Sequence, residues 1–251
     1  VRENLQRADA SKKKVLLEVP FVRQHHMTCA PATLSSLFGY WQQHADHLDI
    51  VEAICYDGTP NHAERRWAVQ QGWHVREFCL EPDIAFALID RGVPFTLSTV
   101  EPGSAHLQAV VGYDQRLGLY LVRDPYYPSI QEFLIEQTGE YYRSSGPRCL
   151  ALVPADQAQL FDGLTFPDGE FYDAYYDVQE ALDQHQRKLG LQRFLQMQAR
   201  QADHRLALMA ERRLARYDQD ALRELAVIER LLQLFPQDIN LQVSKAYVLG
   251  Y

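Results

Sequence analysis

Helical and strand-like hydrophobic patterns occupy different parts of the first 155 residues. Apolar residues recur at helical spacing over 28–44, 48–56, 61–71 and 82–92. Apolar runs typical of β-strands follow at 93–100, 106–113 and 117–124, with weaker ones at 131–135 and 149–154. Helices that precede an antiparallel set of strands predict an α+β fold whose helices are segregated from the sheet.

Polar and restricted residues mark the expected ends of these elements. Thr28 and Asn61 are favourable N-cap residues, and Glu64 follows Asn61 at a spacing typical of a helix start. Pro82 suits the first turn of a helix that ends at Gly92. The strands expected at 106–113 and 117–124 are separated by three residues, which predicts a hairpin.

The amino-acid composition changes near residue 155. Ten of the 12 prolines and 13 of the 17 valines precede that point, whereas the segment after residue 168 is rich in Leu, Ala, Gln, Arg and Glu. The later segment therefore predicts helices at 172–189, 191–214, 219–234 and 238–250. We expect two domains, an α+β domain at 15–155 and an all-α segment at 170–251.

The end of the third of these later helices resembles the junction between tetratricopeptide repeats. Residues 231–238 read LLQLFPQD, in which Pro236 ends one helix and Asp238 starts the next. Ordinary helical hairpins share these features, so both interpretations remain open. The sequence begins at Val1 and stops within a helical pattern, and we therefore expect a piece of a longer protein with a truncated helical segment.

Composition and charge exclude several classes of protein. The chain is 47% hydrophobic and 23% charged, as globular proteins are, and no apolar run reaches the roughly 18 residues of a membrane-spanning helix. The net charge of −8 and the lack of a basic segment argue against nucleic acid or an anionic membrane as a partner. The four cysteines contain no C-x-x-C pair, so we expect free thiols in a cytoplasmic protein without a metal site.

Cys29 is the thiol whose position predicts reactivity. It directly follows Thr28 and lies in the first turn of the expected helix, where backbone N–H groups and the helix dipole favour a thiolate. The side-chain amide of Gln24 and the N–H of Cys29 are candidate donors to an oxygen on which negative charge develops. The other three cysteines lie in apolar surroundings and are expected to be inert.

His106 and Asp124 are the candidate acid–base partners of this thiol. His106 begins the apolar strand 106–113, where one edge of its ring stays accessible, and Asp124 ends the neighbouring strand. A short hairpin brings these strand ends together, so that the carboxylate can orient the imidazole. The thiol of Cys29 would then have the base that a nucleophile needs.

These residues lie in segments that resemble the papain-like cysteine peptidases, and more narrowly the branch that cleaves bacteriocin leader peptides after a double glycine. Residues 19–37, VPFVRQHHMTCAPATLSSL, are similar to its nucleophile motif. Residues 105–114, AHLQAVVGYD, and 122–125, VRDP, follow its pattern of a histidine that opens an apolar strand and an Asp-Pro that ends the next. The resemblance covers about residues 15–155.

The resemblance implies a papain-like fold, cysteine peptidase chemistry, and neither a metal nor an organic cofactor. Matched by position, it implies that Gln24 is the oxyanion donor, Cys29 the nucleophile, His106 the base and Asp124 the orienting residue.

The segment after residue 155 departs from that branch, in which the peptidase domain precedes a membrane transporter with an ATPase. A helical segment follows here, without a G-x-x-x-x-G-K-[ST] loop, so fold and chemistry carry over more directly than double-glycine specificity. Our leading hypothesis is a cysteine peptidase that acts on a peptide or protein and whose trailing helices recruit a partner or substrate. Two alternatives remain open: a thiol-dependent acyltransferase, and a scaffold module that binds peptides without cutting them.

Overall fold

The chain forms two compact units. The structure, a computed structural model, describes residues 12–250. Of these, residues 12–99 and 105–167 form the first unit, and residues 100–104 and 168–250 form the second.

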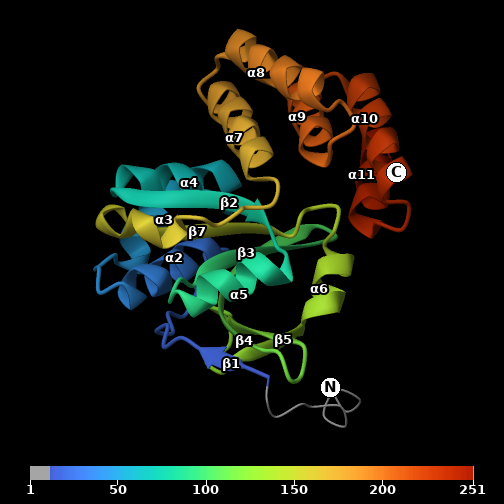
Figure 1. Ribbon diagram of the computed structural model, residues 1–251. Helices are drawn as coiled ribbons and strands as arrows, with labels where there is room; N and C mark the ends of the chain where they lie inside the picture. Colours follow the sequence, from blue (N-terminus) through green and yellow to red (C-terminus); the bar gives the residue numbers. More distant parts are fainter. Residues whose placement is uncertain (1–11, 251) are drawn as a thin grey trace. The chain divides into compact units, whose positions relative to one another are not determined.

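The first unit is built on a seven-stranded sheet with the strand order β2-β7-β3-β4-β5-β6, and β1 pairs with β4 outside this path (Figure 1). Its elements in chain order are β1 (Lys14–Leu16), α2 (Cys29–Tyr40), α3 (His47–Ile54), α4 (Asn61–Gln70), β2 (Trp73–Cys79), α5 (Pro82–Asp90), β3 (Phe95–Glu101), β4 (Ser104–Asp114), β5 (Leu119–Arg123), β6 (Gln131–Leu134), α6 (Ile135–Tyr141), β7 (Arg148–Pro154) and the 3₁₀ helix η1 (Ala155–Phe161). The predicted α+β fold is thereby confirmed.

Strand β2 corrects the predicted order of helices before strands. It lies between α4 and α5 and pairs along its whole length with β7, the last strand of the unit. The hydrophobic pattern missed it because polar residues interrupt the apolar ones. One of these, Glu77, is only 5% exposed, and it pairs there with the oppositely charged Arg148 of β7.

Helix starts also differ from the prediction in detail. Thr28 is the N-cap residue of α2, but its side chain makes no capping bond, and the helix ends at Tyr40 rather than near residue 44. Pro60, not Asn61, is the N-cap residue of α4, and Glu64 turns to a buried arginine instead of the helix start. Pro82 does lie in the first turn of α5, as predicted.

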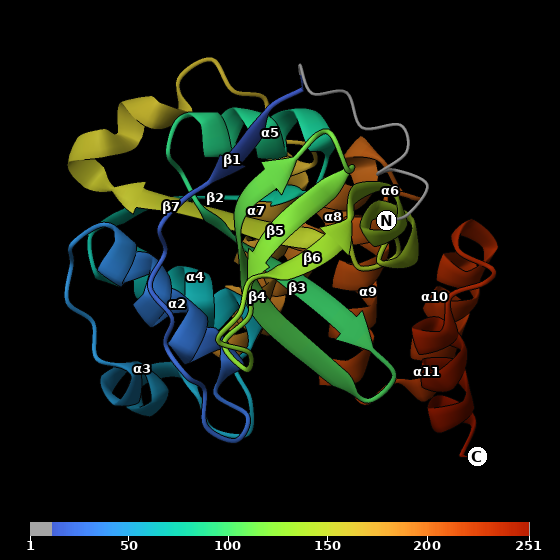
Figure 2. The same cartoon turned by 90° about the horizontal axis from the view of Figure 1, so that it is seen from below.

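Helices pack on both faces of the sheet. Along β7, Leu150 and Leu152 belong to one apolar core with α2 and α4, whereas Ala151 and Val153 belong to a second core with α5 and η1. Figure 2 shows α2 and α5 on opposite sides of β7. The side chains of a strand alternate between faces, so a strand covered on both sides reads as a continuous apolar run.

Strand β1 reaches β4 at a glycine. Leu16 pairs with Gly112, and the N–H of Leu17 donates to the carbonyl of Val111 at 2.8 Å. A Cβ atom at position 112 would overlap the carbonyl oxygen of Val15, so only glycine admits β1 here. The chain that leaves β1 leads directly to the segment before Cys29.

A buried ion cluster joins α4, β2 and β7. The Arg148 guanidinium pairs with Glu64 at 2.7 Å and with Glu77, and it also donates to the Ser98 hydroxyl at 3.3 Å. Burial raises the pKa of Glu64 above its usual range, although Arg148 acts in the opposite direction. Arg65 also pairs with Glu77 at 3.0 Å, so removal of Arg148 would take away the cation that the two buried carboxylates share but would leave Glu77 with this second partner.

The second unit is helical beyond residue 168, as its composition predicts. Its helices are α7 (Gly169–Asp183), α8 (Arg187–Arg200), α9 (Arg205–Tyr217), α10 (Ala221–Leu234) and α11 (Ile239–Leu249). The single helix expected at 191–214 is wrong: the chain breaks after α8, and His204 caps α9 by accepting the N–H of Leu206. The helix start expected at Asp238 is present, where the carboxylate accepts the N–H of Leu241 at 2.7 Å.

The second unit has a small core of its own, formed by side chains from three of its helices. Its buried members are Leu208, Val227, Leu231 and Leu241. Among the helices of residues 12–250, none combines the length and apolar character that crossing a bilayer requires.

Candidate active site

Cys29 is the first residue of α2 and is partly buried. Because the first turn of a helix leaves its N–H groups without intrahelical partners, these groups and the helix dipole favour negative charge on the sulfur. Cys29 therefore lies at the helix position that the sequence predicted.

His106 and Asp124 lie at adjoining ends of β4 and β5. His106 is near the start of β4, Asp124 directly follows β5, and the two strands are paired. The ring Nε2 of His106 is 3.1 Å from Oδ1 of Asp124, and the side chains are 31% and 10% exposed. The same carboxylate oxygen accepts the N–H of Tyr126 at 2.7 Å, which fixes its orientation.

The His106 ring also contacts the Cys29 thiol. The two side chains are hydrogen-bonded, and because Nε2 faces Asp124, the nitrogen left for the sulfur is Nδ1. Burial lowers the pKa of His106, but the hydrogen bonds and charges of Asp124 and Cys29 outweigh it and raise the pKa from 6.5 to about 9. The imidazolium form is thus stabilised next to the sulfur.

Asp124 is held in its ionised form. Its burial raises the pKa, but the hydrogen bond with His106 and the N–H groups of Tyr126 and Tyr127 outweigh it and hold the pKa of Asp124 below its usual range. A carboxylate that stays charged is suited to orienting an imidazolium.

A backbone hydrogen bond of Gln24 connects this residue to the segment that follows Asp124. Its N–H donates to the carbonyl of Pro125, the residue after Asp124, at 3.0 Å. Its side chain is partly buried, and within residues 12–250 its Oε1 atom accepts no hydrogen bond. The orientation of the Gln24 side-chain amide is therefore not fixed by a hydrogen bond to its oxygen.

The four residues singled out in the sequence thus fall in one region of the first unit. Cys29, His106 and Asp124 are joined by side-chain contacts, and Gln24 is joined to the segment after Asp124 by its backbone.

Sequence reasoning missed one group next to this site. His47, at the start of α3, lies 3.0 Å from the hydroxyl of Thr28, the residue before Cys29. The helix start itself had a visible signal, since Asp46 caps it by accepting the N–H of Leu48 at 2.8 Å. The contact between these two helix starts carries no sequence signal, because it joins residues 19 positions apart.

The other cysteines are less uniform than predicted. Cys149 is buried, and burial raises the pKa of its thiol. Cys55 and Cys79 are only partly buried, and their S–H groups donate to the carbonyls of Met27 at 3.4 Å and Gly146 at 2.7 Å. The prediction of apolar core positions is therefore wrong for these two.

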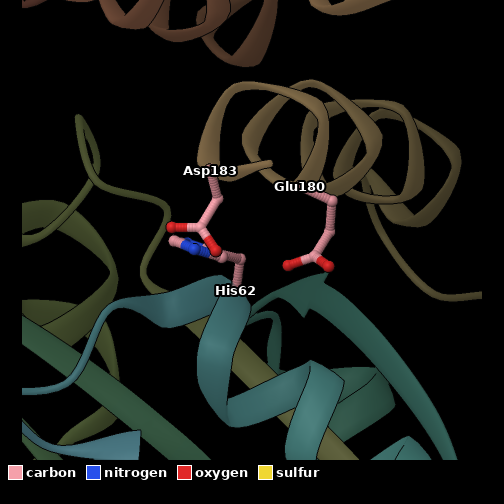
Figure 3. A group of neighbouring side chains, drawn as sticks. All are labelled: His62, Glu180 and Asp183. Atoms are coloured by element: carbon pink, nitrogen blue, oxygen red, sulfur yellow. The ribbon is translucent and has the colours of Figure 1, made fainter. Parts of the chain in front are cut away.

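Figure 3 draws three further side chains of metal-ligating type: His62 on α4, and Glu180 and Asp183 one turn apart on α7. His62 belongs to the first unit and the two carboxylates belong to the second. Neither unit by itself supplies all three groups, so we assign no metal site to them. The absence of a metal site, expected from the sequence, stays a prediction.

A family model described as "Peptidase_C39 like family" matches residues 16–148. This chain belongs to that family. The matched range contains all four candidate residues, and it confirms the family resemblance drawn from the sequence.

Two solved structures are similar to this C39-like chain. A proposed C39-like peptidase from Bacillus anthracis is 16% identical, with a TM-score of 0.46, over 56% of this chain and 98% of its own. The peptidase domain of Streptococcus ComA, a bifunctional ABC transporter of a quorum-sensing pathway, is 19% identical, with a TM-score of 0.46, over 55% of this chain and 99% of its own. No curated protein matches the chain.

Proposed function

We propose that this C39-like chain is a cysteine peptidase in which the Cys29 sulfur attacks a peptide carbonyl. The observation that carries the proposal is the position of the His106 ring, which contacts the Cys29 thiol and lies 3.1 Å from Asp124. Membership in the C39-like family supports the same chemistry. The peptidase domain is assigned to 15–155, and the helices of 170–251 recruit the substrate or a partner.

Acylation uses the nitrogen of His106 that faces the sulfur. In the resting pair, Nδ1 of His106 already carries the proton of the thiol, and the Cys29 thiolate attacks the carbonyl carbon of the substrate. The N–H of Cys29 and the side-chain amide of Gln24 stabilise the charge on the carbonyl oxygen. The imidazolium then gives its proton to the leaving amine, the C–N bond breaks, and a thioester remains on Cys29.

Deacylation reverses the direction of proton transfer. His106 takes a proton from water, the resulting hydroxide attacks the thioester carbonyl, and the C–S bond breaks. The released thiolate stays paired with the imidazolium, which restores the starting state. Throughout, Asp124 holds the ring in place and stabilises its charged form.

Two measurements test the proposal: the rate at which the Cys29 thiol is alkylated and the cleavage of peptide substrates. With limiting iodoacetamide near neutral pH, Cys29 is expected to be labelled faster than the other three cysteines, because it alone has an imidazolium partner. Digestion of a peptide library should give products with wild-type protein and none with Cys29→Ala. Cys79→Ser, which keeps a donor to Gly146, is the matched control and should cleave like wild type.

Other outcomes assign the chain differently. Equal labelling of all four thiols contradicts the thiolate. Labelling of Cys29 with transfer of the acyl group to an added amine, in preference to water, would make the chain an acyltransferase. Peptides that bind equally to wild type and Cys29→Ala, with no turnover by either, would make it a binding module.

A further inference from the structure

Helix α3 supports the segment that leads into Cys29. The hydroxyl oxygen of Thr28 accepts the N–H of His25 at 2.8 Å and lies 3.0 Å from Nε2 of His47, the first residue of α3. Thr28 and His47 are only 7% and 9% exposed. Burial makes this bond costly to lose, because neither group has ready access to water.

The hydrogen bonds of Thr28 are compatible with a neutral His47 ring. Burial, followed by the nearby His25, lowers the pKa of His47 below its usual value, which favours the neutral ring. A neutral ring either accepts the Thr28 hydroxyl proton at Nε2 or donates its Nε2–H to the hydroxyl oxygen, according to the tautomer. In both cases the Thr28 oxygen, which has two lone pairs, accepts the N–H of His25.

The same helix holds the segment at a second point. The Cys55 thiol, which directly follows α3, donates to the carbonyl of Met27 at 3.4 Å. Met27 has a φ of 58°, a conformation that residues with a side chain rarely adopt without support. The His25 ring stacks on that of His47, with centroids 5.4 Å apart and an interplanar angle of 7°. Both ends of α3 thus restrain residues 25–28.

We infer that His47 is a positioning residue, which acts through Thr28 to hold the sulfur and N–H of Cys29 in register with His106. This inference rests on the proposed function, since it explains how the proposed nucleophile Cys29 is held in place. His47 contacts Thr28, and Thr28 is joined to Cys29 by one peptide bond. A shift of about 1 Å at a reacting group can cost about a hundredfold in rate, so this support bears directly on turnover.

Paired substitutions separate the hydrogen bond from the packing. His47→Leu and Thr28→Val keep the volume but remove the bond, whereas His47→Gln and Thr28→Ser keep a polar partner. We expect the first pair to lower kcat by about tenfold to a hundredfold with little change in KM, and the second pair to stay within about threefold of wild type. His44→Gln, an exposed histidine just before α3, is the matched control and should be unchanged.

Labelling of Cys29 separates this inference from the proposed function. The rate of Cys29 alkylation as a function of pH needs no substrate, and we expect it to fall in His47→Leu and Thr28→Val but not in the polar variants. Unchanged kcat and labelling in both apolar variants would overturn the inference while wild-type turnover still supports a peptidase. A wild type without turnover would refute the peptidase, and the labelling rates would still decide the role of His47.

The Thr28 variants separate a loss of positioning from a general loss of stability. If His47→Leu does not fold, the pair Thr28→Val and Thr28→Ser decides, because the first replaces only the hydroxyl group by a methyl group and the second keeps the hydroxyl group and removes only the methyl group. Equal kcat and labelling rates in that folded pair would overturn the inference.

Discussion

His106 determines the charge state of the candidate site. Its ring is partly exposed and would have a pKa lowered by burial alone, but Asp124 on one nitrogen and Cys29 on the other raise the pKa to about 9. The ring therefore keeps its proton throughout the neutral range. In the proposed cycle this proton goes to the leaving amine, so the charge of one side chain limits turnover at high pH.

Asp124→Asn tests this dependence. For wild type we expect kcat/KM to fall as the pH rises through about 9, where His106 loses its proton. Asparagine cannot stabilise the imidazolium by charge, so the alkaline limb should move to lower pH by about one unit or more. The measurement is kcat/KM from about pH 5 to 10. Asp156→Asn, at an exposed position of η1, should leave the limb in place, and an unmoved limb in Asp124→Asn contradicts the argument.

At the scale of elements, local pairing decided what the sequence could predict. Since β4 and β5 form a hairpin, the proximity of His106 and Asp124 follows from spacing alone. The position of Cys29 opposite that hairpin needed the family resemblance, because no local pattern relates α2 to β4. Strand β2 was not predicted because Glu77 looks like an exposed residue in the local sequence. It is buried because it pairs with Arg148, which is 71 residues away in the chain.

Gly112→Ala tests the pairing of β1 with β4. The added methyl group would collide with the backbone of β1, so we expect a loss of about 1–3 kcal/mol in the free energy of unfolding. Gly139→Ala in α6 meets no atom within 4 Å and should be neutral or slightly stabilising. Urea denaturation of both variants gives the comparison. Equal stability of the two would show that β1 adjusts without cost.

Arg148→Met tests the buried ion cluster. Loss of the cation leaves Glu64 buried without Arg148 and leaves Glu77 with Arg65, and we expect a destabilisation of about 3–5 kcal/mol. Arg143→Met removes an exposed arginine that lies 3.9 Å from Glu140, and it should cost less than about 1 kcal/mol. Thermal and urea unfolding measure both. A mild effect of Arg148→Met would mean that the carboxylates take up protons or water instead.

At the scale of the whole molecule, the chain contains two units with separate apolar cores. The cores of the first unit lie on the two faces of its sheet, and the second unit has the cluster around Leu208 and Val227. The composition change near residue 155 predicted this division of structure classes, though not the break between α8 and α9.

Leu208→Ala tests whether the units unfold separately. Truncation of this buried side chain should lower the stability of the second unit by about 2–5 kcal/mol, as cavities in apolar cores do. Hydrogen exchange should rise in α9, α10 and α11, while Cys29 alkylation keeps its wild-type rate. Leu222→Ala, whose side chain is 83% exposed, is the control. Faster exchange throughout the β-sheet would show one cooperative unit instead.

The junction formed by Asp124 and Pro125 has a consequence for protein engineering. The side chain of the first residue orients His106, and the carbonyl of the second receives the N–H of Gln24. A designer who transfers the proposed reaction centre to another scaffold must therefore transfer the dipeptide together with His106 and Gln24. A shift of this stretch by one residue would then change the position of the proposed base and of the proposed oxyanion donor together.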